Sequence, residues 1–234
     1  MALPKLTTPT YELELPSTAE PLKYRPWQMR EQKLLMIAQE SDETKQIEEA
    51  FASIIRSCTF DKIDPYNSPL FDIEYIFLQL RGKSVGEKIK LNLLCEDDGV
   101  TRVEKEIDLA DVEVQMDVNH ENIIKLTDDI EIHMRYPQLS DMSLISTDGQ
   151  VKMIFEMIKR CILEIHDGET VHNIVDISNK ELDAFLDSMS QEHFEKISVF
   201  FETMPKLRHK IKVTNPKTKK KNDITVEGLE SFFG

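Results

Sequence analysis

Two segments near the N-terminal end repeat apolar residues at helical spacing. The first spans residues 28–39, with Leu34 and Ile37 among charged neighbours. The second spans residues 43–58, with apolar side chains three and four positions apart at Ile47, Ala50, Phe51, Ile54 and Ile55. An apolar stripe on a charged cylinder is typical of an amphipathic helix. The pattern predicts a helical hairpin.

A denser apolar run follows at residues 70–81, and Gly82 comes directly after it. So dense a run fits a buried helix or a buried strand, because periodicity alone does not separate them. Its length and the acids in its first turn favour a helix that Gly82 ends.

The middle of the chain alternates polar and apolar residues. Residues 88–94 do so clearly and residues 100–109 more weakly, on either side of an acidic glycine turn at 97–99. Period two around such a turn predicts a β-hairpin. Further short strands are predicted at 112–116, 123–126 and 130–134, so we expect one small antiparallel sheet here.

Helical spacing returns in the later part of the chain. It predicts helices at 150–165, at 179–189 and at 191–203. The second of these begins with a capping box, Ser178 with Glu181. Beyond Pro205, residues 207–213 and 224–226 are predicted to form strands around a lysine-rich turn.

Five prolines fall within the first 26 residues, which predicts an extended arm. Within this arm, residues 10–15 could form one short edge strand. We expect Tyr11, Leu13 and Leu15 either to lie on the protein's own domain or to add a strand to a partner's sheet.

These elements predict an α+β protein with no fixed-period repeat. We expect five consecutive parts, namely an extended arm (1–27), a helical hairpin plus a buried helix (28–82), a small antiparallel β-sheet (83–140), a helical bundle (141–205) and a basic β-hairpin with an apolar tail (206–234).

Net charge, hydropathy and cysteine content exclude several classes of protein. The 234 residues carry a net charge of −14, which argues against nucleic-acid binding because affinity for phosphates depends on Lys and Arg. No stretch approaches the roughly 18 uncharged apolar residues of a membrane span, and no signal-peptide pattern opens the chain. The three cysteines are not closely paired, which suits a reducing compartment. A cytosolic protein is expected.

The charge reverses locally between residues 203 and 222, which hold eight bases and no acid. At the centre of this stretch are Lys217, Lys219, Lys220 and Lys221. They are candidates for contact with an acidic partner, an anionic surface or the protein's own acidic face, and the alternative is a solvated hairpin tip.

The last residues include Leu229, Phe232 and Phe233. If fully covered, each would contribute roughly 1.5–3 kcal/mol from buried apolar area. Such a tail could fill a partner's groove or pack on its own hairpin.

Motifs for chemistry are scarce. Gly82-Lys83-Ser84 lacks the first glycine of a phosphate-binding loop, because Phe77 stands at that position. His166, Asp167 and His172 are assigned to a solvated polar loop. We therefore predict no catalytic, cofactor or metal site and a protein that is not an enzyme, with a nucleotide- or metal-dependent enzyme as the alternative from another class.

Four stretches resemble the baseplate hub assembly proteins of T-even-like contractile-tailed phages. They lie at residues 1–6 with 11–18, 69–87, 130–137 and 228–234. The resemblance implies a viral protein made in the host cytoplasm, without catalytic activity, that helps to build the tail baseplate hub. The resemblance implies that many relatives carry a Cys-x-x-Cys knuckle in the hairpin that follows residues 69–87, which suggests a small zinc ribbon. This chain keeps only Cys95 of it, so no metal is carried over.

The resemblance leaves two roles open. The protein could be a transient, chaperone-like factor that binds hub or tape-measure subunits, or a permanent subunit of the hub in the virion tail. Apolar termini that are expected to be exposed, the strong acidity and the basic hairpin favour the transient factor, since opposed charges help encounter more than final affinity. A homo-oligomer is a further open alternative, and neither nucleic acid nor membrane is an expected partner.

Overall fold

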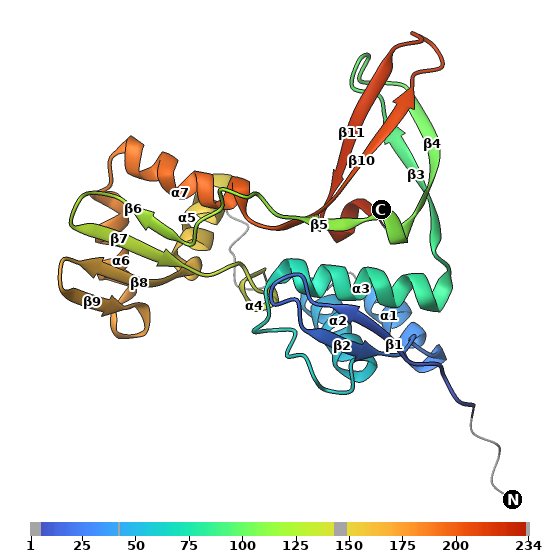
Figure 1. Cartoon of the computed structure of the whole chain (residues 1–234), viewed down its shortest axis with the longest axis horizontal. Helices are drawn as coiled ribbons and strands as arrows, with labels where there is room; N and C mark the ends of the chain where they lie inside the picture. Colours follow the sequence, from blue (N-terminus) through green and yellow to red (C-terminus); the bar gives the residue numbers. More distant parts are fainter. Residues whose placement is uncertain (1–5, 42, 143–148, 233–234) are drawn as a thin grey trace, which may run out of the picture. The chain divides into compact units, whose positions relative to one another are not determined.

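The computed structural model describes residues 6–41, 43–142 and 149–232 and divides the chain into two compact units (Figure 1). Unit 1 comprises residues 1–115 and 206–234, and unit 2 comprises residues 116–205. Unit 2 is thus an insertion within the sequence of unit 1. Both units combine helices with small antiparallel sheets, which confirms the predicted α+β class.

Unit 1 begins with a β-hairpin and three helices. Strands β1 (Tyr11–Glu14) and β2 (Pro21–Tyr24) pair antiparallel, and α1 (Met29–Ser41), α2 (Thr44–Cys58) and α3 (Leu70–Val85) follow. The predicted helical hairpin is confirmed by the contacts between α1 and α2. The arm holds two strands instead of one, because Pro21 is tolerated at the first position of β2. Their apolar side chains join one core with α2 and α3 through Leu13, Leu22, Tyr24, Ile54, Ile55, Ile73, Ile76 and Leu80.

Helix α3 does not end at Gly82 as predicted. It continues to Val85 and is followed by Gly86, whose φ of 144° suits glycine alone. Gly82 itself is buried, and a β-carbon there would lie 3.9 Å from the side chain of Leu109. This separation is an ordinary van der Waals contact, so Gly82 is a buried position inside the helix and not its end.

The rest of unit 1 consists of two β-hairpins on a shared core. The first pairs β3 (Lys88–Leu94) with β4 (Arg102–Asp108), and the short helix η1 (Leu109–Asp111) follows. The second pairs β10 (Lys206–Thr214) with β11 (Lys221–Glu227) before η3 (Leu229–Phe232). Both predicted hairpins are confirmed. Their inward side chains form one cluster that includes Leu78, Leu91, Ile107, Leu207, Ile211, Val226 and Phe232.

Strand β5 (Glu113–Gln115) pairs with the start of β10, so that Gln115 lies opposite Lys206. The chain therefore leaves unit 1 and returns to it at neighbouring positions of one strand pair. The predicted single central sheet is wrong: its strands fall into three different sheets, β3–β4, β11–β10–β5 and a sheet of unit 2.

Unit 2 contains a four-stranded antiparallel sheet in the order β6–β7–β8–β9. Its strands are β6 (Ile123–Lys125), β7 (Ile130–Met134), β8 (Ile162–Asp167) and β9 (Thr170–Asn173). Its helices are α4 (Leu139–Met142), α5 (Gln150–Cys161), η2 (Ile174–Asp176), α6 (Asn179–Asp187) and α7 (Gln191–Thr203). Helices α5, α6 and α7 cover one face of the sheet, with a core that includes Ile132, Met134, Ile158, Ile162, Leu182, Leu186, Ile197 and Phe200.

The predicted helix at 150–165 is wrong beyond Cys161, and the predicted helical bundle contains a β-hairpin. Residues 162–167 form β8, which pairs with β7 through a bulge: Met134 lies opposite Ile162 and His133 opposite Glu164, so that Leu163 has no partner in the register. The bulge turns Ile162 and Ile165 to the same buried face although they are three residues apart. In the sequence, a spacing of three between buried apolar residues is typical of a helix.

A buried ion pair fixes the start of α1. Arg25, directly after β2, donates to Glu31 Oε1 over 2.8 Å and to the carbonyl oxygen of Pro26, while its backbone N–H donates to the Cys58 carbonyl. Burial alone would raise the pKa of Glu31, but hydrogen bonds from Arg25, from the Gln28 amide and from Arg30 lower it to about 2. Glu31 is therefore held as a carboxylate.

A similar ion pair lies in unit 2. Arg135, directly after β7, donates to both carboxylate oxygens of Asp141, over 2.7 and 2.8 Å. Its backbone N–H donates to the carbonyl oxygen of Cys161 over 2.7 Å. The hydrogen bonds to Asp141 raise the pKa of Arg135. The pair fixes the start of α4.

Candidate interaction surfaces and a histidine and glutamate cluster

The basic turn lies at the tip of the β10–β11 hairpin, and Lys217, Lys219, Lys220 and Lys221 are all exposed there. Asn215 shapes the turn: its side-chain oxygen accepts from the backbone N–H groups of Lys217 and Thr218, over 2.8 and 3.2 Å. Lys219 adopts a left-handed conformation with φ of 63°. The lysines thus extend from a turn whose backbone is fixed by hydrogen bonds.

The acidic turn between β3 and β4 is bound to this basic tip through Asp97. One carboxylate oxygen of Asp97 accepts from the side-chain amides of Asn215 and Asn222, over 2.9 and 3.0 Å, and the other accepts from the Thr218 hydroxyl. These hydrogen bonds hold the pKa of Asp97 below its usual range. The protein's own acidic turn therefore contacts the hairpin, and it does so through uncharged side chains that leave the lysines at the surface.

The turn around Cys95 does not fit a zinc ion. Cys95 is buried, and this burial, followed by the charges of Asp97 and Asp98, raises the pKa of its thiol. The carboxylate of Asp98 already accepts from the backbone N–H and the hydroxyl of Thr101, over 2.9 and 2.6 Å. One thiol beside carboxylates that are engaged in hydrogen bonds is not the ligand set of a structural zinc site.

The apolar tail packs into unit 1. Phe232 has only 2% of its surface exposed and belongs to the core of the two hairpins. Leu229 is half-buried, and its N–H donates to Glu74 Oε1 over 3.1 Å. Phe233 lies outside the described residues. Of the two alternatives for the tail, Leu229 and Phe232 therefore fit the one in which the tail packs on the chain's own hairpin. Phe232 could bind a partner only if its side chain left the core.

Strand β1 contributes one of its four side chains to the core, and the other three are exposed. Leu13 is buried and Leu15 half-buried against the core formed with α2 and α3. Tyr11 is partly exposed, with its ring centroid 5.7 Å from that of Tyr24 and 5.3 Å from Lys83 Nζ. Addition of β1 to a partner's sheet stays a prediction.

Unit 2 has an apolar groove between α5 and α7 that the sequence analysis did not anticipate. Its volume is about 440 Å³, and it is lined by Met142, Met153, Ile154, Met157, Ile158, Ser198, Phe201 and Glu202. Met153 and Ile154 are 44% and 45% exposed in this groove. Methionine side chains adapt to differently shaped apolar partners.

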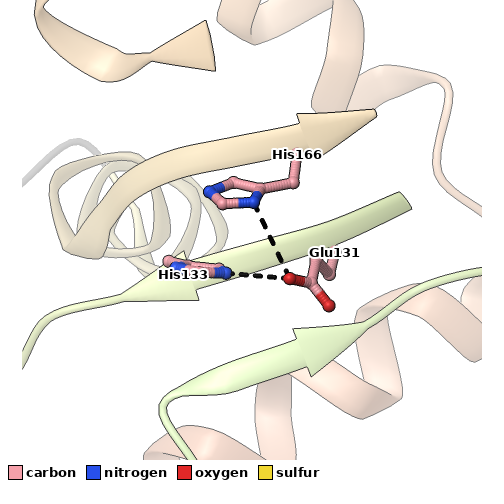
Figure 2. A group of neighbouring side chains, drawn as sticks. All are labelled: Glu131, His133 and His166. Carbon is pink, nitrogen blue, oxygen red and sulfur yellow. Dashed lines mark hydrogen bonds and ion pairs between the residues drawn. The ribbon is translucent and has the colours of Figure 1, made fainter. Parts of the chain in front are cut away.

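The outer face of the unit 2 sheet holds a cluster of two histidines and two glutamates. Strand β7 carries Glu131 and His133, and β8 carries Glu164 and His166. Antiparallel pairing places Glu131 opposite His166 and His133 opposite Glu164. Figure 2 shows Glu131 Oε1 facing the same edge of both imidazole rings; it lies 3.0 Å from His133 Nε2 and 3.7 Å from His166 Nδ1.

The other side of the ring pair is occupied by Glu164, whose Oε2 lies 3.0 Å from His166 Nε2 and 3.8 Å from His133 Nδ1. The rings are stacked with centroids 4.0 Å apart. The hydrogen bond from His133 lowers the pKa of Glu131. The prediction that His166 lies in a polar loop is wrong, because it belongs to β8. The pattern Glu-x-His, present once in each strand, is the sequence signal that could have revealed the cluster.

Glu131, His133 and His166 bring one ligand atom each to within 4.8 Å of one another. Among residues 6–41, 43–142 and 149–232, this is the one group of three His, Cys, Asp or Glu residues whose ligand atoms are this close together. No helix in the described part of the chain is long and apolar enough to cross a membrane.

Comparison with known proteins gives one family. The family model described as T4 bacteriophage base plate protein matches residues 8–234. No curated protein and no solved structure matches the chain significantly. The matched range includes both units, so the inserted unit 2 is part of what the family model describes.

Proposed function

Because the chain belongs to the T4 bacteriophage base plate protein family, we propose that it is a transient assembly factor that holds hub or tape-measure subunits while the baseplate is built. It acts by binding proteins and not by catalysis, in the cytoplasm of the infected host. The family supports contact with other baseplate proteins; the transient role is the part that the proposal adds.

The observation that carries the proposal is the exposed lysine cluster on an acidic chain. Lys217, Lys219, Lys220 and Lys221 lie on a tip whose backbone is held by Asn215, and Asp97 in turn holds the side chain of Asn215. The protein as a whole has a net charge of −14. A fixed basic tip attracts an acidic partner surface and orients the encounter, while contributing little to final affinity at physiological salt. Such contacts favour binding that is fast and reversible.

The groove of unit 2 supports the same role. A methionine-lined groove of about 440 Å³ suits the apolar face of an amphipathic helix on a partner. Apolar contact in this groove would supply affinity, whereas the lysines would supply the rate of encounter.

The test measures the protein in infected cells by quantitative mass spectrometry of assembly intermediates and of purified mature tails. We expect it in the intermediates and at no fixed ratio in mature tails. A constant number of copies per mature tail would contradict the transient role and favour a permanent structural subunit of the hub.

A charge variant tests the surface itself. Changing Lys217, Lys219, Lys220 and Lys221 to Gln should slow capture of baseplate proteins about tenfold at low salt, and by less at high salt. A control with the same loss of charge changes four exposed lysines elsewhere, Lys23, Lys62, Lys125 and Lys180, to Gln. If both variants lose capture equally, net charge and not the hairpin tip is responsible.

A further inference from the structure

We propose that Glu131, His133 and His166 form a binding site for a divalent transition metal ion such as Zn²⁺. Two imidazoles and one carboxylate are a ligand set that Zn²⁺ accepts readily, and Co²⁺, Ni²⁺ and Cu²⁺ also bind such sites. The three side chains converge on one point of the outer sheet face (Figure 2). This inference is independent of the proposed assembly role.

The separations of the ligand atoms suit a metal ion. Bonds of about 2.0–2.1 Å in a tetrahedral site place neighbouring ligand atoms about 3.3–3.4 Å apart. Glu131 Oε1 lies 3.0 Å from His133 Nε2 and 3.7 Å from His166 Nδ1, on either side of that value. The two imidazole nitrogens lie within 4.8 Å of one another on stacked rings, so the rings would have to turn about their side-chain bonds to point both nitrogens and the oxygen at one ion.

Glu164 would orient the ligands without binding the ion. Its Oε2 lies on the opposite side of the rings, 3.0 Å from His166 Nε2, the nitrogen that faces away from Glu131. A carboxylate that accepts from the remote N–H of a ligating imidazole fixes its tautomer and makes the other nitrogen a stronger ligand. His133 Nδ1 lies 3.8 Å from the same oxygen.

The backbone holds the ligands in place before any ion binds. Glu131 and His133 are alternate residues of β7, and His166 is paired directly opposite Glu131 on β8, in the interior of a four-stranded sheet. The side chains of His133 and His166 are 26% and 23% exposed, so an ion can reach them from solvent. Ligands on rigid paired strands lose little entropy on binding, which favours affinity. A bound ion would also join β7 to β8.

The experiment titrates the full-length protein, first freed of metal by a chelator, with Zn²⁺ by calorimetry and with Co²⁺ by visible absorption. We expect one ion per chain and a thermal unfolding temperature that rises with Zn²⁺ concentration. Affinity should fall below about pH 6, because protonated imidazole does not bind metal.

Variants locate the site. His133→Gln and His166→Gln should each weaken Zn²⁺ binding by on the order of 100-fold. Glu164→Gln should weaken it by about tenfold, as expected for a residue that orients a ligand. His172→Gln is the matched control, since His172 lies on β9 of the same sheet but is paired with the inward-facing Ile165.

Circular dichroism of each metal-free variant checks that it is folded. If a histidine variant is not folded, Glu131→Gln, which keeps the shape of the side chain, tests the same site. The proposal is overturned if the wild-type chain shows no saturable binding. It is also overturned if His172→Gln loses as much affinity as His133→Gln, or if the cluster variants retain full affinity. In those cases the cluster is a set of hydrogen-bonded ion pairs only.

Discussion

The two units contain the same strand-to-helix junction. Arg25 follows β2 in unit 1 and Arg135 follows β7 in unit 2, and each backbone N–H donates to the carbonyl oxygen of a cysteine at the end of a later helix. Those cysteines, Cys58 and Cys161, are both fully buried. Each arginine also donates to the carbonyl oxygen of the residue that follows it.

The acid of each junction is the third residue of the next helix, Glu31 in α1 and Asp141 in α4. Each carboxylate also accepts from a backbone N–H just before the helix, that of Gln28 or Gln138, over 2.8 Å. A carboxylate in the first turn satisfies N–H groups that lack partners and interacts well with the helix dipole. The repeated unit is therefore the junction, and it begins a long helix in one unit and a helix of one turn in the other.

The junctions differ in how the carboxylate is shared. Asp141 receives both donors from Arg135 in a bidentate pair, whereas Glu31 is contacted by Arg25, by Arg30 and by the hydroxyl of Ser57. Among the described residues, the charged partner of Asp141 is therefore Arg135 alone, whereas Glu31 would keep its hydrogen bonds with Arg30 and Ser57 if Arg25 were lost. A shared geometry therefore does not imply an equal contribution to stability, and substitutions at Arg135, Glu31, Arg25 and Arg30 test this difference.

The largest effect is expected for Arg135→Ala. The substitution removes the bidentate partner of Asp141, whose side chain is 2% exposed, and leaves the hydrogen bond from the Gln138 N–H. Removing one partner of a buried ion pair costs about 3–5 kcal/mol. Urea unfolding followed by circular dichroism should show this loss in the transition of unit 2. A loss below about 1 kcal/mol would show that the Asp141 carboxylate does not depend on Arg135 for its stabilisation.

The second effect concerns pH and unit 1. The pKa of Glu31 is lowered from 4.5 to about 2 in the folded protein, which corresponds to about 3 kcal/mol. A lowered folded-state pKa contributes stability that is fully present above pH 4.5 and is lost as pH falls towards 2. The stability difference between wild type and Glu31→Gln should therefore shrink across this window. A difference that is constant between pH 5 and pH 2 would show that the charge of Glu31 is not involved.

The smallest effect is expected for Arg25→Ala alone, at about 2 kcal/mol, because Glu31 keeps the contacts with Arg30 and Ser57. The double variant Arg25→Ala/Arg30→Ala removes both cations and should approach the loss caused by Arg135→Ala. Arg30→Ala is the control, since this arginine is largely exposed. If Arg25→Ala costs as much as the double variant, Arg30 does not compensate and the two junctions are equivalent.

Local patterns predicted the local elements well. The helical hairpin, the two predicted β-hairpins (β3–β4 and β10–β11) and the capping box of Ser178 with Glu181 are present, because each depends on neighbours in the sequence. Strand β8 was missed because its bulge gives Ile162 and Ile165 a helical spacing. The repeated junction was missed because the cysteine follows its arginine at a different distance in each unit, which leaves no fixed period.

The sites required distant contacts. The exposure of the lysine turn follows from its polarity, so the sequence was sufficient to predict it. The partner of that turn, Asp97, depends on two hairpins that are far apart in the chain, and the Glu-x-His pairs meet only through the register of β7 and β8. Burial of Phe232 likewise depends on the core of both hairpins, which no local pattern specifies.

The insertion of unit 2 sets an order for protein synthesis. Unit 1 takes Leu207, Ile211 and Phe232 of its core from residues that the ribosome adds after the whole of unit 2. All of unit 2 has been translated before β10 emerges to pair with β5. At that stage a nascent chain can fold unit 2 while the apolar side of the β3–β4 hairpin is still uncovered. Unit 1 is therefore completed only after unit 2.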